Sequence, residues 1–273
     1  MTKCVTLALT TGPNKLENIE SAFQLMEKAV RQQSPDWIVL PEVFTCFGSA
    51  KEVAQAGETD SGILAKQLAQ FASKHGVTIF AGSMQELAPS DGRVFNTSLV
   101  FGPTGVTIAK YRKTHLFSLK DSTGNSLYDE TVSYEAGSKL CAFSHEGKNI
   151  WLAICYDLRF PGFFEALYNK FGAPDVIVIP AAFTFQTGKD HWLTLLRARA
   201  IEYQCYVIAA NQVGYHSKEK RSFGHSVIID PWGEILGDTA DEIGYASGVI
   251  ELDKIHQVRS KLPALRNRRD DIY

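Results

Sequence analysis

The chain has 273 residues, of which 45% are apolar and 11% aromatic, enough to bury the core of one large α/β or sandwich domain. We expect a single domain over residues 1–273, because no Pro-, Gly- or Ser-rich linker divides the chain. The formal net charge of -2, with both signs mixed along the chain, provides no basic stripe to neutralise phosphates, so we expect no nucleic-acid partner.

Apolar runs typical of strands alternate with helical patterns in the first half of the chain. "KCVTLALT" is followed by a helical pattern over about residues 14–33, then by "DWIVLPEVF", a second helix over about residues 62–75, and "VTIFAGSMQE". This order predicts βα units. The runs "SLVFG" and "GVTIAKY" flank "PTG", which predicts a hairpin and therefore antiparallel pairing in the same sheet.

The second half repeats this layout. "NIWLAIC", "DVIVIPAAF", "CYVIAANQV", "GHSVIID", "EILGD" and "GVIEL" are typical of strands, and we expect helices over about residues 162–171 and 190–204 and from about residue 253. Two similar halves predict two sheets packed face to face with helices outside, an α-β-β-α sandwich. Residues 117–137 show no clear period, and such a long loop is usually functional or disordered.

The cysteines and the apolar runs indicate a cellular compartment. The five cysteines are odd in number and widely spaced, and they form no CxxC pair and no cluster of zinc-site spacing. We therefore expect no metal and a reducing compartment, the cytoplasm. The N-terminal apolar run is too short for a signal peptide, and no segment approaches the length that spans a bilayer, so we expect no membrane partner.

Three predicted strands end in chemically reactive side chains. "DWIVLPEVF" places Glu42 after an apolar run, "GVTIAKYRKTHLF" places Lys110 and Lys113 after another, and "NIWLAICYDLRF" places Cys155 after a third. Taken singly, these are most often a solvated Glu, a solvated basic turn and a small core residue. Function in α/β sheets collects where strand ends converge, so the three side chains can also form one chemical unit.

That unit suits nucleophilic catalysis. A thiol with a reference pKa of about 8.5 needs a base or a nearby positive charge to attack at neutral pH, and Glu42 can supply the base. Attack on a carbonyl or nitrile carbon develops negative charge, which the Lys113 ammonium can stabilise as the donors of an oxyanion hole do. The pattern therefore predicts Cys155 as a nucleophile.

The same motifs resemble a known family. "LPEVF", "KYRKTHLF" and "CYDLRFP", in this order and with these separations, are similar to the Glu-Lys-Cys motifs of the nitrilase, or carbon–nitrogen hydrolase, superfamily. The resemblance spans nearly the whole chain and ends in "LPALRNRRDDIY", which is similar to that family's closing tail. It implies a four-layer α-β-β-α sandwich with two mixed, six-stranded sheets, no metal or organic cofactor, and a homodimer.

The resemblance also implies a role for each matching residue. Glu42 corresponds to the general base, Lys113 to the catalytic lysine and Cys155 to the nucleophile, while Lys110 is expected to be a surface or strand-end charge. The backbone N–H of Tyr156 corresponds to the second oxyanion donor.

The family has a further acid in the irregular loop. Glu130 occupies the matching position, with Asp129 and Glu135 close by as alternatives. The reaction implied is acyl transfer to water: the Cys155 thiolate attacks an amide carbon, ammonia leaves after taking a proton, and Glu42 activates water against the thioester. The expected partner is thus a small-molecule amide.

The segments around the nucleophile resemble the Nit-type amidases. "RARAIEYQCYV", "KEKRSFGHS" and "DPWG" are most similar to deaminated glutathione amidases, ahead of the ω-amidases of α-ketoglutaramate and the N-carbamoyl amino acid amidohydrolases. Nitrile hydrolysis is disfavoured, because true nitrilases generally carry a tryptophan where this chain has Tyr156. A catalytically silent binding protein of this fold would lack Glu, Lys or Cys at a motif position, and here all three are filled.

Arg159, Phe183 and Thr187 are the candidate substrate-binding residues. Arg159 faces the pocket if the chain turns tightly into a helix after the nucleophile, and its guanidinium can then bind a carboxylate with two hydrogen bonds. The alternative is that Arg159 pairs with Asp157 and holds the turn. Phe183 and Thr187 are expected on the loop after "VIVIPAAF", at another strand end, as pocket walls.

Overall fold

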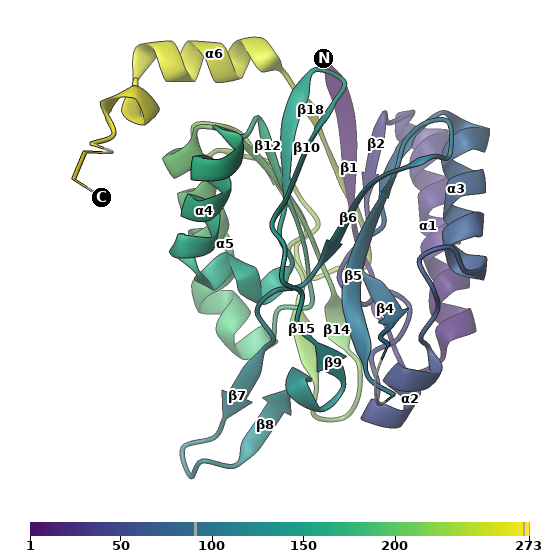
Figure 1. Ribbon diagram of the computed structural model, residues 1–273. Coiled ribbons are helices and arrows are strands. Elements are labelled where there is room, and N and C mark those ends of the chain that lie inside the picture. Colours follow the sequence, from purple (N-terminus) through teal and green to yellow (C-terminus); the bar gives the residue numbers. More distant parts are fainter. Residues whose placement is uncertain (90–91, 270, 273) are drawn as a thin grey trace.

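Two β-sheets pack face to face between two outer layers of helices (Figure 1). The structure, a computed structural model, describes residues 1–89, 92–269 and 271–272. The predicted four-layer α-β-β-α sandwich is therefore confirmed. No helix in the described part of the chain is long and apolar enough to cross a membrane.

The first sheet mixes parallel and antiparallel strands. Its strands are β1 (Thr2–Ala8), β2 (Trp37–Val39), β3 (Thr78–Phe80), β4 (Met84–Leu87), β5 (Val94–Phe101), β6 (Thr107–Arg112), β9 (Tyr134–Glu135) and β18 (Gly244–Ile250). Six of them follow the order β18-β1-β2-β3-β5-β4, and β6 and β9 pair with β5 beside this path. β1, β2 and β3 are parallel, whereas β5 and β6 form the predicted antiparallel hairpin.

The second sheet has the expected six strands. In spatial order they are β10 (Cys141–His145), β11 (Lys148–Leu152), β12 (Val176–Ala181), β13 (Tyr206–Asn211), β16 (Val227–Ile229) and β17 (Ile235–Asp238). The parallel strands β11, β12 and β13 are buried on both faces, which explains their continuous apolar runs. The sequence did not predict β10, because this edge strand is only partly buried and lacks such a run.

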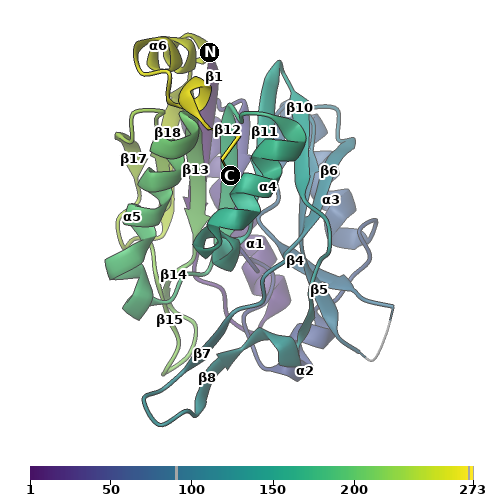
Figure 2. The ribbon, with the colours of Figure 1, turned by 60° about the vertical axis from the view of Figure 1, so that its left-hand side comes forward.

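Helices cover the outer face of each sheet, as Figures 1 and 2 show. α1 (Lys15–Gln33) and α3 (Ile63–His75) pack on the first sheet, and α4 (Pro161–Phe171) and α5 (Phe185–Tyr203) on the second. The short α2 (Ala50–Gln55) was not predicted, and α6 (Leu252–Lys261) follows β18 near the C-terminus. Asn14 caps α1, since its side chain accepts hydrogen bonds from the first N–H groups of the helix.

α5 begins at Phe185 and not near residue 190, which corrects the sequence prediction. Its first turns contain Gly188, a poor helix former that hides the start of the pattern. The structure shows why glycine suits this position: an added Cβ would lie 2.4 Å from the Phe223 Cβ. The loop after β12 is therefore short, and Thr187 belongs to the helix.

Residues 117–137 form regular structure in place of the unpatterned loop that the sequence shows. β7 (Ser118–Lys120) and β8 (Ser126–Asp129) make a hairpin that projects from the sandwich, followed by the 3-10 turn Glu130–Val132 (Figures 1 and 2). A second hairpin, β14 (Val213–Tyr215) and β15 (Arg221–Phe223), lies at the same end of the molecule (Figure 1). Both hairpins are short and partly exposed, so neither has a clear apolar period.

Gly82, just after β3, permits a close contact with the backbone that follows β2. Its φ is +45°, and an added Cβ would lie 2.0 Å from the Pro41 carbonyl oxygen. The next residue, Ser83, accepts a hydrogen bond of 2.9 Å from the backbone N–H of Val43, which itself has a φ of +46°. This contact sets the course of the chain around Glu42.

We predict that Gly82→Ala lowers the free energy of unfolding by about 2–4 kcal/mol, since a left-handed Cβ and a backbone clash both add cost. Gly76→Ala is the matched control, because Gly76 is also left-handed, with φ +65°, but has open space around its Cβ. The control should cost only about 1 kcal/mol. Urea unfolding measures both, and equal losses would show that the close contact has no energetic weight.

Candidate active site

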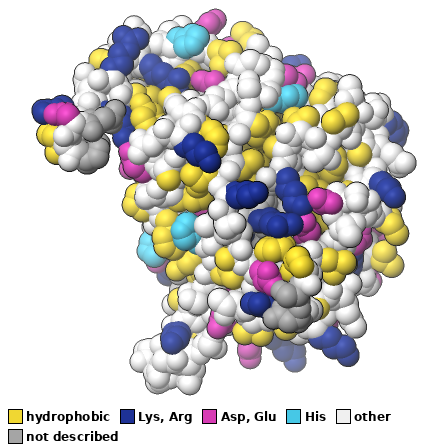
Figure 3. All heavy atoms as spheres, viewed as in Figure 1, with side chains coloured by type: hydrophobic (Ala, Val, Ile, Leu, Met, Phe, Trp, Pro, Cys, Tyr) yellow, Lys and Arg dark blue, Asp and Glu magenta, His cyan; other side chains and the backbone are white. Residues whose placement is uncertain are grey.

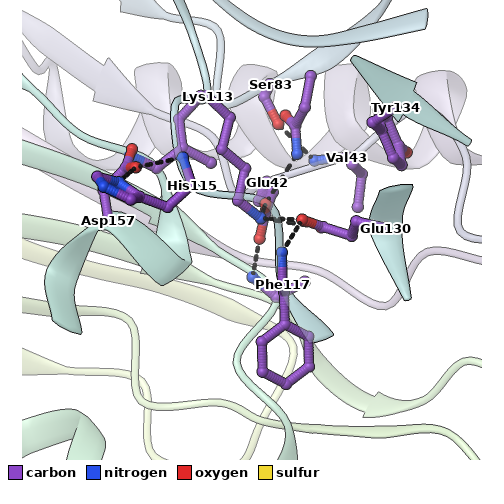
Figure 4. Close-up of polar contacts among 12 residues, drawn as sticks. Glu42, Val43, Ser83, Lys113, His115, Phe117, Glu130, Tyr134 and Asp157 are labelled. Carbon is purple, nitrogen blue, oxygen red and sulfur yellow. Dashed lines mark hydrogen bonds and ion pairs between the residues drawn. The ribbon is translucent and has the colours of Figure 1, made fainter. Parts of the chain in front are cut away.

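The Lys113 ammonium lies between two carboxylates (Figure 4). Its Nζ is 2.8 Å from Glu42 Oε1 and 2.8 Å from each carboxylate oxygen of Glu130. The Lys113 side chain is 1% exposed and that of Glu42 is 3% exposed. Lys113 directly follows β6, whose end is held by a hydrogen bond from the Lys113 N–H to the Asn96 carbonyl. Charge buried so completely is stable only when it is paired in this way.

The Glu42 carboxylate, which follows β2, is held by hydrogen bonds on both of its oxygens. Oε1 accepts a second hydrogen bond from Asn96 Nδ2 at 2.9 Å, and Oε2 accepts one from the backbone N–H of Ala182 at 2.7 Å. Gln212 Nε2 also donates to the Glu42 carbonyl at 2.9 Å. The carboxylate is therefore fixed from three elements, β5, β6 and the end of β12.

Cys155 stands on a sharp turn just beyond β11. Its φ is +45°, a left-handed conformation that costs a non-glycine residue about 1–3 kcal/mol. The 3-10 segment Cys155–Arg159 and then α4 follow at once, so the predicted elbow from strand to helix is present. The side chain remains 8% exposed and lines a cavity, which an ordinary core cysteine would not need to do.

Asp157 holds this turn together. Its carboxylate is fully buried and accepts hydrogen bonds from Tyr111 Oη at 2.6 Å, the Ile154 N–H at 2.8 Å, and the backbone N–H of His115 at 3.1 Å. His115 Nδ1 lies 2.7 Å from the same carboxylate (Figure 4). Asp157 thus ties the turn after β11 to the chain that carries Lys113.

Burial and charge set the protonation of the central groups. Burial alone would lower the pKa of Lys113, but the negative charges of Glu130 and Glu42 outweigh it and raise that pKa well above its ordinary value. Burial raises the pKa of the Cys155 thiol well above its ordinary value, and Glu42 raises it further, while Lys113 opposes both. At neutral pH the resting site therefore holds an ammonium and a thiol.

Glu130, and neither of its two neighbours, reaches the cluster. It begins the 3-10 turn after β8, and its Oε2 also accepts a hydrogen bond of 2.7 Å from the Phe117 N–H. Asp129 instead accepts hydrogen bonds from the backbone and hydroxyl of Thr131, and Glu135 pairs with Arg93. Burial raises the pKa of Glu130, Lys113 lowers it, and the charge of Glu42 raises it again.

A cavity of about 320 Å³ opens beside this cluster. Cys155, Glu42 and Glu130 line it together, and its walls come from the segment after Glu42, α2 and the β7–β8 hairpin. Pockets for small molecules typically begin at about this volume. Among the described residues, no group of three or more His, Cys, Asp and Glu side chains is placed to hold a metal ion.

A small recess adjoins this cavity at Cys155 and is lined by the remaining predicted residues. Arg159, Phe183 and Thr187 line it together with Tyr156. The Arg159 guanidinium lies 4.8 Å above the Phe183 ring and 3.2 Å from His191 Nδ1. Arg159 makes no ion pair with Asp157, so the alternative that it holds the turn is wrong.

Phe183 lies on the short loop after β12, but Thr187 does not. Thr187 belongs to the first turn of α5, and its hydroxyl lies 2.8 Å from that of Thr184. The Phe183 side chain is 3% exposed, and its N–H donates to Asn211 Oδ1. Thr187 therefore lines the recess from a helix, and the prediction that it lies on a loop is wrong.

Tyr156 contributes its backbone at the turn. Its N–H belongs to the first residues of the 3-10 segment, whose N–H groups have no acceptor within the segment. The Tyr156 ring contacts Phe117 and Phe160 edge-on, with centroids 5.1 Å away in both pairs. The ring thus packs into the wall, and the N–H belongs to the residue that directly follows Cys155.

Lys110 lies outside this cluster, as the sequence predicts. Its ammonium pairs with Asp60 at 2.7 Å and with Glu86, and Arg112 Nη2 contacts Glu86 at 2.7 Å. Figure 3 shows Lys and Arg side chains gathered near the middle of this face, where β6 lies in Figure 1. These charges belong to the surface of the first sheet.

Sequence reasoning missed three contributors to the site. Asn96 opens the polar triplet "NTS" between the apolar ends of the buried strand "VFNTSLVF", a signal that could have identified it. Ala182 contributes only its backbone N–H, so its side chain gives no sign of this role in the sequence. Asp157 was considered only as a partner of Arg159.

Comparisons with known proteins agree with this geometry. A family model described as carbon-nitrogen hydrolase matches residues 6–260. The chain is 40% identical over 265 residues to the deaminated glutathione amidase of Synechocystis, with 96% of each protein covered. It is 33% identical over 262 residues to Omega-amidase NIT2 of Xenopus tropicalis, covering 96% of this chain and 93% of that protein.

A solved structure gives the same result for the fold. The crystal structure of the Caenorhabditis elegans NitFhit protein superimposes with a TM-score of 0.91 at 32% identity, covering 100% of this chain and 66% of that one. The family model matches most of the chain, and the relatives cover nearly all of it. The chain belongs to the carbon–nitrogen hydrolase family.

Proposed function

We propose that this hydrolase of carbon–nitrogen bonds is an amidase that cleaves a small, carboxylate-bearing amide through a thioester on Cys155, with deaminated glutathione as its substrate. One observation carries the proposal: a buried ammonium, Lys113, is clamped by Glu42 and Glu130 beside the cavity that Cys155 lines. The 40% identity to a deaminated glutathione amidase supports the choice of substrate.

Glu42 is placed to act as the general base. Because burial and the carboxylate charge keep the Cys155 proton on sulfur in the resting site, the thiolate forms only as attack begins. Glu42 then takes the thiol proton while the sulfur bonds to the amide carbon. The four contacts that fix Glu42 limit the reorganisation this transfer requires.

Lys113 and the Tyr156 N–H stabilise the tetrahedral oxyanion. An ammonium held by two carboxylates in a dry site does not need to reorient when negative charge appears, and this is the condition for strong electrostatic catalysis. The proton on Glu42 passes to the leaving nitrogen as the C–N bond breaks. Glu42, again a carboxylate, deprotonates the water that hydrolyses the thioester, and Cys155 is regenerated.

The nature of the substrate decides which amine leaves. In deaminated glutathione the broken C–N bond joins the acyl group to a dipeptide, so the leaving group is a dipeptide amine. Ammonia, the leaving group expected from the sequence, leaves only from an unsubstituted amide such as α-ketoglutaramate. The second candidate activity, an ω-amidase, is supported by the 33% identity to Omega-amidase NIT2 of Xenopus tropicalis.

We further propose a single domain that works as a homodimer in the cytoplasm. The family model matches residues 6–260 as one unit, and all five cysteines are free thiols, which suits a reducing compartment. Exposed apolar side chains on α5, β17 and the turn before β17 support self-association, among them Ile201, Trp232 and Leu236.

The proposal predicts a clear order among three substrates. Purified protein should hydrolyse deaminated glutathione fastest, α-ketoglutaramate next and an N-carbamoyl amino acid least, and Cys155→Ala should lose at least about 1,000-fold in turnover. The rate at which the acid product is released measures the hydrolysis of the first two substrates, so their rates can be compared directly. Mass spectrometry after a brief pulse should find an acyl group on Cys155. Turnover of the carbamoyl compound alone would show that the substrate is wrong.

The charges around Cys155 predict opposite pH shifts in two variants. Removing the carboxylate in Glu42→Gln should lower the pKa of the thiol, and removing the ammonium in Lys113→Met should raise it, each by roughly 1–3 pH units. The pH dependence of iodoacetamide alkylation at Cys155, followed by peptide mass spectrometry, measures both. Glu42→Gln should thus react faster at pH 8 although it has lost turnover. Shifts of the same sign would contradict the electrostatic account.

Arg159→Lys should raise KM for a carboxylate-bearing amide about tenfold or more, with a much smaller effect on a neutral amide. The physical reason is that an ammonium cannot replace the two parallel hydrogen bonds of a guanidinium. Steady-state kinetics with α-ketoglutaramate and an uncharged aliphatic amide measure the two effects. Equal increases of KM for both amides would mean that Arg159 does not bind the carboxylate of the substrate.

A further inference from the structure

A second cation lines the cavity of about 320 Å³, which we call the main cavity. Lys220 lines it together with Cys155 and Glu42, and lies at the end of the loop between β14 and β15. The backbone of this loop is well held: the His216 N–H donates to the Lys220 carbonyl at 2.8 Å, and the Lys220 N–H donates to Ser217 Oγ at 3.2 Å. The loop therefore presents Lys220 from a defined position.

The buried side chain of His216 also anchors this loop to the rest of the protein. His216 is buried, contacts Thr11 and Ser222 through its two ring nitrogens, and stacks on Phe47 with ring centroids 4.1 Å apart. Phe47 is itself part of the cavity wall. The position of Lys220 is thus coupled to the wall of the cavity and not only to the exposed tip of a hairpin.

The Lys220 ammonium has no carboxylate partner in the part of the chain that the structure describes. It lies 5.8 Å from the Phe47 ring centroid and 5.2 Å from that of Tyr128, so two aromatic faces surround it. The cavity's carboxylates have other partners. Glu42 and Glu130 bind Lys113, and Asp129 binds Thr131. The positive charge of Lys220 is therefore available to a ligand.

The sizes of the two spaces beside Cys155 decide how a substrate is oriented. The recess that Arg159 lines has a volume of only about 20 Å³, whereas the cavity that Lys220 lines has about 320 Å³. Of the two halves of the proposed substrate, the acyl chain is the shorter and the dipeptide the bulkier. We infer that the bulkier dipeptide occupies the larger cavity, which leaves the end of the acyl half on the side of Arg159.

We propose that Lys220 binds a carboxylate at the far end of the substrate's leaving amine, so that the site selects amides whose released amine is itself an anion, such as a dipeptide. This inference rests on the proposed function. It assigns the two cations separate tasks: Arg159 serves the acyl half and Lys220 serves the amine half. An unsubstituted amide, which releases ammonia, makes no use of Lys220.

Three substrates and two variants test this assignment. The substrates are deaminated glutathione, its analogue with a carboxamide in place of the C-terminal carboxylate, and α-ketoglutaramate. The variants are Lys220→Met, which keeps an apolar stem, and Lys218→Met, a matched control in the same loop whose exposed side chain does not line the cavity. The measured quantity is kcat/KM for each pair.

Wild type should prefer the carboxylate form over the carboxamide about tenfold, the value expected for one charge-assisted hydrogen bond in a partly open site. Lys220→Met should abolish this preference and should lower the ratio of kcat/KM for deaminated glutathione to that for α-ketoglutaramate about tenfold. Lys218→Met should keep the wild-type ratios. Lys220→Arg should restore most of the preference.

Other outcomes overturn the assignment in distinguishable ways. A tenfold preference that persists in Lys220→Met, or an equal loss on all three substrates, would show that Lys220 does not bind the amine half. Wild type that hydrolyses α-ketoglutaramate but not deaminated glutathione would overturn this inference and leave the amidase function standing. Wild type that hydrolyses none of the three would overturn the proposed function and this inference with it.

Discussion

The arrangement of the site depends on one buried cation. Lys113 is 1% exposed, and moving an ammonium from water into such an interior costs several kcal/mol unless partners compensate for it. Glu42 and Glu130 provide that compensation, and they come from parts of the chain that are far apart in sequence. Removing one partner of a buried ion pair typically costs about 3–5 kcal/mol, so the three elements are constrained to meet.

The same cluster bears on how a weak acid can serve as the nucleophile that we propose. Burial and the charges of Glu42 and Glu130 raise the pKa of the Cys155 thiol, and Lys113 opposes them, so the proton stays on sulfur in the resting site. A thiolate that existed permanently would be open to oxidation in any solvent-accessible cavity. In the proposed mechanism, a thiol that is neutral at rest and loses its proton only during attack is both protected and reactive.

Much of this arrangement could be predicted from the sequence, because its signals are local. Apolar runs identified the central strands, and the reactive residues at their ends identified Glu42, Lys113 and Cys155 as neighbours. The start of α5 was wrong because Gly188 interrupts the helical pattern for a packing reason that only Phe223 reveals. The Ala182 N–H could not be found, since any residue supplies one. Lys220 was not singled out because a lysine in a polar hairpin resembles a solvated charge.

The β7–β8 hairpin and the turn after it combine two duties on one short segment. Tyr128 forms part of the cavity wall beside Lys220, and Glu130, two residues later, binds the Lys113 ammonium. Phe117, where the segment begins, donates its N–H to that same carboxylate. An insertion or deletion that reshapes the wall within this segment therefore also displaces Glu130. In this part of the wall, a change of selectivity is tied to a change in the ion cluster.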